Sequence, residues 1–192
     1  MPPGCPGKRG DKQPACYAVA QAFDHAMLKS LIPILYAQLS PHRLDVRNAR
    51  TGGTWSGAPE LAIQQEPKPT ILAVGDSARQ AAAQTGARLV NPLDHPRSII
   101  SDYTLAEQLL RHAVQHVLRS GGSTWGLAPS PHLVLHPPSD PAGGYTQVEL
   151  RALRELGMGS GASKVTLWHG APLSDEDLRS GNFPATGQVL QA

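Results

Sequence analysis

The segment 104–119 constrains the fold of this chain more strongly than any other part of the sequence. Its apolar residues recur every three or four positions, at Leu105, Leu109, Leu110, Ala113, Val114, Val117 and Leu118. This spacing predicts an amphipathic helix that packs its apolar stripe against a core. Thr104 and Glu107 have the spacing of a capping box, so we expect the helix to begin at Thr104.

Short apolar runs that are typical of strands stand before and after this helix: 34–39, 44–48, 61–63, 70–75, 132–136 and 164–168. The first two predict a hairpin, and the third extends it into a meander. Further helices are predicted at 77–85, at 147–156 and from Ser174 onward. Asp76 and Thr146 are the expected caps of the first two. A meander followed by alternating helices and strands predicts an α/β fold, with a mixed sheet and helices packed on it.

Length and composition exclude several classes of protein. A chain of 192 residues with 40% apolar and 17% charged residues has the size and character of one globular domain. The net charge of +2 comes from scattered residues, so we expect no nucleic-acid partner. The two cysteines are too few for a disulfide framework. No apolar run is long enough to span a membrane and no signal peptide is visible, so we expect a cytoplasmic protein.

The beginning of the chain differs in character from the rest. Residues 1–30 are rich in proline and glycine and carry a mixed charge patch, which predicts a disordered leader. Met27 stands just before the first apolar block, so translation starts at either Met1 or Met27.

Candidate chemistry is sparse. His112 and His116 lie four residues apart on one face of the long predicted helix, the spacing of a metal-binding pair, but a third ligand is not identified. The alternative is that both histidines lie at the solvent-exposed edge of the apolar stripe.

Glycines 157, 159 and 161 follow a helix and precede a strand, the reverse of a phosphate loop, so we interpret them as a helix end. Four further histidines lie beside predicted loops or strand ends without a visible partner: His42, His95, His136 and His169. These residues alone support no enzyme class.

Several phrases, in their order and spacing, resemble the MreB family of bacterial actin-like proteins that determine rod shape. They are residues 71–78 (ILAVGDSA), 91–93 with 99–103 (NPL and IISDY), 133–139 (LVLHPPS) and 146–155 with 161–167 (TQVELRALRE and GASKVTL). The resemblance covers about residues 31–184. It implies the first half of an actin-like ATPase fold, an RNase-H-like five-stranded sheet with flanking helices. Residues 65–100 would form a small inserted subdomain, and residues 185–192 a loose tail.

The chain departs from the family at the positions that bind and hydrolyse ATP. Where the family has an Asp-x-Gly-Thr phosphate loop, residues 37–40 read Ala-Gln-Leu-Ser, without the metal-side carboxylate and without the glycine. Where the family has a glutamate that orients the attacking water, this chain has His169. The second half of the family's fold would follow where this sequence ends. If a nucleotide binds, the candidate residues are Ser40, His42, Ser139 and His169.

The resemblance and its departures together predict a function. We expect a non-catalytic MreB-like protein, without a cofactor, that acts through protein partners such as cell-shape or filament components, or through self-association. The alternative is an ATP-binding protein that completes its cleft by oligomerising. In either case the sheet face that packs on the second half in the complete fold must be made polar, covered by the leader, or buried in an oligomer.

Overall fold

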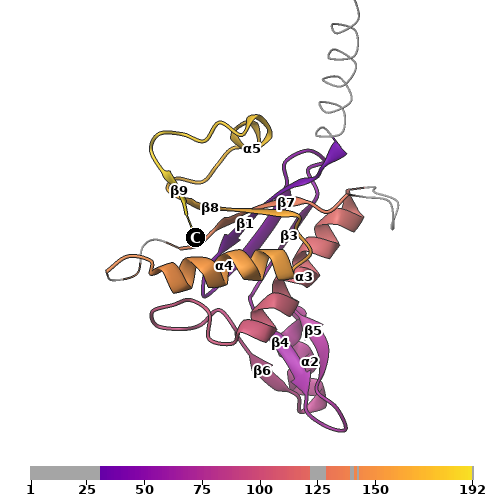
Figure 1. The fold of residues 1–192 in the computed structure, drawn as a ribbon. Coiled ribbons are helices and arrows are strands. Elements are labelled where there is room, and N and C mark those ends of the chain that lie inside the picture. Colours follow the sequence, from indigo (N-terminus) through magenta and orange to yellow (C-terminus); the bar gives the residue numbers. More distant parts are fainter. Residues whose placement is uncertain (1–30, 122–128, 139–140, 142, 192) are drawn as a thin grey trace, which may run out of the picture. The chain divides into compact units, whose positions relative to one another are not determined.

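The computed structural model describes residues 31–121, 129–138, 141 and 143–191. The predicted leader, residues 1–30, and the candidate Ser139 lie outside the described residues. From Pro33 onward the chain forms one compact unit. The predicted α/β class is confirmed, with helices on a mixed sheet (Figure 1).

The main sheet has six strands in the order β3-β2-β1-β7-β8-β9. Their bounds are β1 Ile34–Leu39, β2 Leu44–Asn48, β3 Thr54–Gly57, β7 His132–His136, β8 Lys164–His169 and β9 Gln188–Leu190. The first three form an antiparallel meander, and β1, β7 and β8 run parallel. In the parallel register Leu35 lies beside Leu133, which lies beside Val165. The centre of the sheet is therefore built from the most apolar strands of the chain.

Two predictions about this sheet are wrong. The third strand of the meander is β3, and not the run 61–63, because Val46 and Arg47 pair with Trp55 and Thr54. The sheet has a sixth strand because β9 pairs antiparallel with the edge of β8, with Leu190 beside Leu167. Residues 188–190 of the expected loose tail therefore belong to the sheet.

A second, small sheet contains β4 (Leu61–Gln64), β5 (Thr70–Val74) and β6 (Arg88–Val90), in the order β5-β4-β6. Helix α2 (Ser77–Thr85) packs on β4 and β5. We predicted the inserted subdomain over 65–100. The small sheet starts earlier because β4, whose residues 61–63 are buried, is its central strand. The short strand β6 was not predicted.

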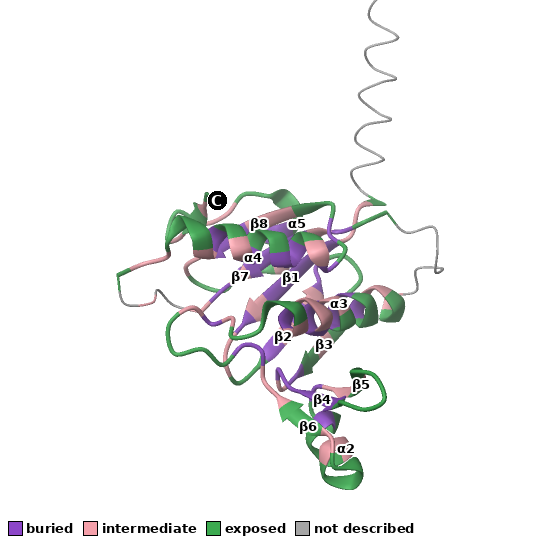
Figure 2. Ribbon diagram, turned by 60° about the horizontal axis from the view of Figure 1, so that its bottom comes forward, coloured by how far each residue is buried: buried purple, intermediate pink, exposed green. Residues whose placement is uncertain are grey.

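Helices α3 (Tyr103–Ser120) and α4 (Gln147–Gly159) cover one face of the main sheet, and α5 (Asp175–Ser180) lies on the other face (Figure 1). Because side chains alternate along a strand, β1 contributes to both faces. Leu35, Ala37 and Leu39 pack in the large core with α3 and α4. Ile34 and Tyr36 join a smaller cluster with residues of α5 and its flanking loops. In Figure 2 the buried residues concentrate on β1, β7 and the sheet-facing sides of α3 and α4.

Helices α3 and α4 begin at side-chain caps, whereas α2 does not. At Thr146 the predicted capping box with Glu149 is present. Helix α3 begins instead after Asp102, whose carboxylate accepts a hydrogen bond from the N–H of Leu105, so Thr104 is not its cap. Asp76 makes no cap bond on α2 and accepts the N–H of Ala58, at 2.8 Å.

Helix α4 runs past its predicted end near residue 156, to Gly159. Glycine inside a helix is unfavourable, so Gly157 needs a packing reason. A methyl group added at Gly157 would lie 2.8 Å from Cγ2 of Val165 on β8. The glycine therefore allows α4 to approach the sheet closely, and it does not end the helix.

Candidate functional site

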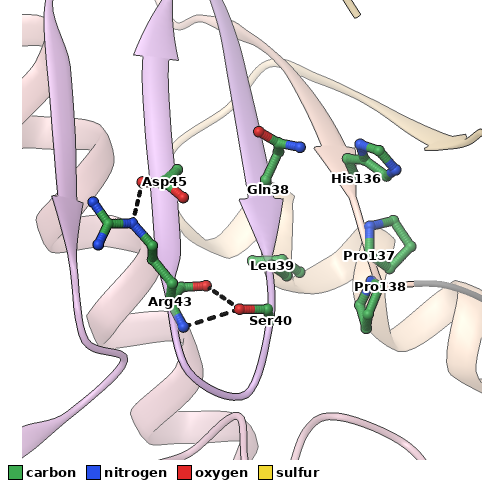
Figure 3. Close-up of a pocket in the computed structure, with 8 residues that line it drawn as sticks. All are labelled: Gln38, Leu39, Ser40, Arg43, Asp45, His136, Pro137 and Pro138. Atoms are coloured by element: carbon green, nitrogen blue, oxygen red, sulfur yellow. Dashed lines mark hydrogen bonds and ion pairs between the residues drawn. The ribbon is translucent and has the colours of Figure 1, made fainter. Parts of the chain in front are cut away.

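A shallow cavity of about 310 Å³ lies where β1 and β7 end (Figure 3). Ligands of α/β proteins commonly bind at the carboxyl ends of parallel strands, which makes this cavity the candidate site. It is lined by Gln38, Leu39, Ser40, Arg43, Asp45, His136, Pro137 and Pro138. Gln38 and His136 are parallel register partners on adjacent strands, so their side chains stand next to each other on the same face of the sheet.

The hairpin tip at the edge of this cavity is closed by its own hydrogen bonds. The N–H of Ser40 donates to the carbonyl of Arg43 at 3.0 Å, and the N–H of Arg43 donates to Oγ of Ser40 at 2.9 Å. Pro41 between them has no N–H. A phosphate cradle needs several backbone N–H groups that point at the ligand. Within residues 40–43 only the N–H of His42 remains for that purpose.

The charges in the cavity are largely paired. Nε of Arg43 lies 3.0 Å from Oδ1 of Asp45, and both side chains are exposed. The hydroxyl of Ser56 donates to the same carboxylate oxygen. The one cation and the one carboxylate that line the cavity therefore neutralise each other, and the site does not present the concentrated positive charge that a polyphosphate attracts.

His136 connects the cavity to Tyr36, which lies on the same face of the sheet. Its Nδ1 lies 2.5 Å from the hydroxyl of Tyr36. Burial lowers the pKa of His136, as does the nearby His169, whereas a hydrogen bond to the backbone of Gly170 opposes the shift. Burial raises the pKa of Tyr36 despite the Arg47 guanidinium over its ring. At neutral pH the imidazole is therefore neutral and the phenol keeps its proton.

The structure brings together only part of the predicted nucleotide candidates. Ser40 lines the cavity, whereas His42 is exposed on the hairpin tip and is not among the lining residues. His169 ends β8 and acts electrostatically on His136 from the neighbouring strand, outside the lining. Sequence reasoning had singled out His136 without finding its partner, because the partner, Tyr36, lies 100 residues earlier. Nothing in the sequence marked Arg43 and Asp45 as site residues, apart from their place in a predicted hairpin.

His112 and His116 both lie on the exposed side of α3. The ring of His112 makes an edge contact with Trp55, with 6.1 Å between ring centroids. Burial beside this ring, followed by the charges of His116 and Arg119, lowers the pKa of His112. Within the described residues, no group of three or more His, Cys, Asp or Glu side chains is placed to hold a metal ion.

Across the part of the chain that the structure describes, every helix is too short or too polar to cross a bilayer.

Comparison with known proteins adds to this picture. The sequence profile described as "MreB/Mbl protein" matches residues 54–173, which is more than half of the chain. Cell shape-determining protein MreB of Escherichia coli K12 is 32% identical over 111 residues, which are 56% of this chain and 29% of that protein. The same protein of Haemophilus influenzae is also 32% identical, over 110 residues. The matched part thus spans less than a third of the length of these relatives.

Solved structures show the same fold. MreB5 of Spiroplasma citri bound to AMPPNP has a TM-score of 0.54 at 21% identity, over 71% of this chain and 38% of that chain. A non-polymerising mutant of MamK bound to AMPPNP has a TM-score of 0.51 at 18% identity, over 71% of this chain and 40% of that one. The fold is thus about half of an actin-like ATPase fold. The chain belongs to the MreB/Mbl family of cell shape-determining proteins.

Proposed function

We propose that this protein is a non-catalytic member of the MreB family that acts through protein–protein contacts in cell shape or the cytoskeleton. The observation that carries the proposal is the closed hairpin tip, where Ser40 and Arg43 use the backbone N–H groups that a phosphate would need. Phosphoryl transfer depends on positioning and on electrostatic stabilisation of the phosphates. A site without backbone N–H groups to hold the phosphates cannot position them for this reaction.

Two further features support a pseudo-ATPase. Gln38 stands in the segment where the family has its metal-side carboxylate, and an amide oxygen is a weaker ligand for Mg²⁺ than a carboxylate. By the resemblance, His169 stands where the family has its water-orienting glutamate, and the nearby His136 is neutral. Neither side chain supplies the negative charge that Mg²⁺ coordination or water activation uses.

The second face of the main sheet supports a role in contacts. Part of it is covered by α5 and its flanking loops, where Leu173, Leu178 and Phe183 pack on Trp168. The rest of this face, toward the cavity, carries polar side chains such as Gln38 and His136. We propose that the protein works in the cytoplasm of a bacterial cell, with a filament component, a shape-determining protein or a second copy of itself as partner.

The test is affinity capture of the full chain from its native cell after crosslinking, in parallel with the variant Arg43→Ala. The proposal predicts that filament or cell-shape proteins, or the untagged chain itself, are enriched equally by both baits. The variant alters the candidate site without touching a buried residue, so it separates partner binding from nucleotide binding. Capture in which none of these proteins is enriched would contradict the proposal.

The alternative function is an ATP-binding protein whose cleft is completed by a second chain. The position of the cavity at the carboxyl ends of β1 and β7 favours it. The test is sedimentation velocity of the full chain with and without Mg-ATP. The alternative predicts that association increases with ATP and that Arg43→Ala abolishes the increase. A sedimentation coefficient that ATP does not change removes this alternative.

A further inference from the structure

The loop between β8 and α5 is held on the second face of the main sheet by side chains from three different strands. Tyr36 of β1 accepts the N–H of Leu173 at 3.3 Å. Arg47 of β2 donates to the carbonyl of Leu173 at 2.5 Å and to Asp175 at 2.9 Å. His136 of β7 bonds to the backbone of Gly170. The segment 170–175 is therefore attached at both of its ends.

Two of these attachments form one continuous chain of hydrogen bonds. The N–H of Leu173 donates to the oxygen of Tyr36, and that hydroxyl lies 2.5 Å from Nδ1 of His136. The hydrogen bond between His136 and the backbone of Gly170 favours the charged imidazole. The ring is therefore the donor in this bond, and a backbone carbonyl is the acceptor. Tyr36 is only 1% exposed, so water does not replace a lost partner of its hydroxyl.

The direction in which these hydrogen bonds run depends on the charge of His136. A phenol has one proton to donate, and Nδ1 accepts it only when that nitrogen carries no proton. When the imidazole is protonated, both of its nitrogens become donors. The hydroxyl of Tyr36 then faces two donors, from His136 and Leu173, and its own proton has no acceptor in a buried place. Leaving a buried donor without an acceptor is costly.

We propose that Tyr36 and His136 form a proton-operated latch. Neutral His136 lets the Tyr36 hydroxyl hold the N–H of Leu173, and protonation breaks that bond, so that residues 171 and 172 loosen between the attachments at Gly170 and at the Leu173 carbonyl. This loosening breaks the bond from Nε1 of Trp168 to the carbonyl of Ala171 and exposes the indole, which is otherwise 1% exposed. Helix α5 stays near the sheet, because the ion pair between Arg47 and Asp175 does not depend on the histidine proton.

The charged and titratable groups around His136 determine how readily it takes up a proton, and the hydrogen bond to the backbone of Gly170 favours the protonated ring. On β8, His169 disfavours a second positive charge, and on β2 the Arg47 guanidinium lies 4.6 Å from the centre of the Tyr36 ring. On the cavity side, the carboxylate of Asp45 is engaged by Arg43. On α5, Asp175 is engaged by Arg47. Burial and His169 together lower the pKa of His136, so the latch is closed at neutral pH and opens in acid.

The first test follows the latch in the unaltered full chain by NMR between pH 7.5 and 4.5. We expect the ring of His136 to titrate below its ordinary range, with Nδ1 unprotonated at neutral pH. The amide of Leu173 must shift with the same midpoint. A Leu173 amide that does not follow the His136 titration would overturn the proposal. The signals of His132, which titrates on the same face, are resolved separately.

A second test uses a chain with Trp168 as its single tryptophan, made by Trp55→Phe and Trp125→Phe, and measures acrylamide quenching. Quenching is expected to rise several-fold as pH falls.

Three further variants of this single-tryptophan chain test which group is responsible. His136→Gln keeps a hydrogen-bond acceptor that does not titrate and should remove the rise. Tyr36→Phe should be quenched strongly at every pH, and His42→Gln, on the exposed hairpin tip, is the matched control. A rise that persists in His136→Gln assigns the effect to another group and refutes the latch.

Discussion

The hydroxyl of Ser40 accepts a hydrogen bond from the N–H of Arg43 and donates one to the carbonyl of the same residue, at 2.9 and 2.8 Å. This reciprocal pair closes the hairpin between β1 and β2 at the edge of the candidate site. It makes the tip of this hairpin a closed turn.

The first prediction follows from this pair. Ser40→Ala removes both side-chain bonds and should lower the free energy of unfolding by about 1 kcal/mol, the usual worth of a lost hydrogen-bonding side chain in a turn. Ser40→Thr keeps the hydroxyl and is the matched control. Urea unfolding followed by circular dichroism measures both variants. Equal stability of Ser40→Ala and the parent would mean that the turn closes without the hydroxyl.

The two capping-box sequences of the chain make a second prediction. Thr146 accepts the N–H of Glu149 and begins α4, whereas Thr104 lies inside α3 after the true cap, Asp102. Thr146→Ala should therefore cost about 1 kcal/mol, and Thr104→Ala should leave stability nearly unchanged. Thermal unfolding of the two variants side by side measures the difference. If Thr104→Ala is the more damaging change, α3 begins where the sequence placed it.

These caps illustrate what the sequence predicts and what it leaves open. Periodicity located α3 and α4 correctly because the apolar stripe and the helix share one period. The cap of α3 was placed two residues too late because Asp102 and Thr104 both have cap chemistry. Only the geometry decides which side chain reaches an N–H, here that of Leu105.

Errors in the sheets have a different origin. The run 61–63 is apolar enough for either sheet, and its membership depends on pairing with β5 and β6, which lie up to about 30 residues later. The same holds for the candidate site. The polar neighbours Gln38 and His136 become adjacent only through the parallel register of β1 and β7, which no local pattern specifies. Ser40 was found because a resemblance pointed to the hairpin tip.

The third prediction concerns the attachment of α2 to the small sheet. Glu60 is buried, and its two carboxylate oxygens accept bonds from Nε and Nη2 of Arg79, both at 2.7 Å. Arg79→Met leaves the buried carboxylate of Glu60 without its ion-pair partner, so the substitution should lower the melting temperature. Arg151→Met breaks the exposed pair with Glu155 and is the matched control, with a much smaller effect expected. Equal effects of the two changes would contradict this account of Glu60.

The fourth prediction is a pH dependence of stability. Burial, and then the charge of Lys164, lowers the pKa of His132 from 6.5 to about 4, and its Nε2 lies 2.8 Å from Oγ1 of Thr166. The unfolded chain takes up this proton at a higher pH than the folded chain, so stability should fall as pH drops from 6.5 to about 4. The full shift would correspond to roughly 3 kcal/mol, which we reduce to about 2 kcal/mol because the ring is only half-buried.

Urea unfolding at several pH values across this range measures that dependence. His132→Asn keeps a hydrogen-bonding group next to Thr166 without titrating there, so its stability should depend less steeply on pH. The residual slope reports the other groups with lowered pKa values: His112, His136 and, near the acid end of the range, the carboxylate of Glu149. An unchanged slope in the variant would show that His132 titrates normally in the folded chain.

The central claim is that the hairpin tip and its cavity do not hold a nucleotide. Isothermal titration calorimetry of the purified full chain with Mg-ATP tests it most directly, with the oligomeric state measured on the same sample. The account predicts no binding heat at millimolar ATP, for the monomer and for any oligomer present. Binding in the micromolar range or tighter would contradict it.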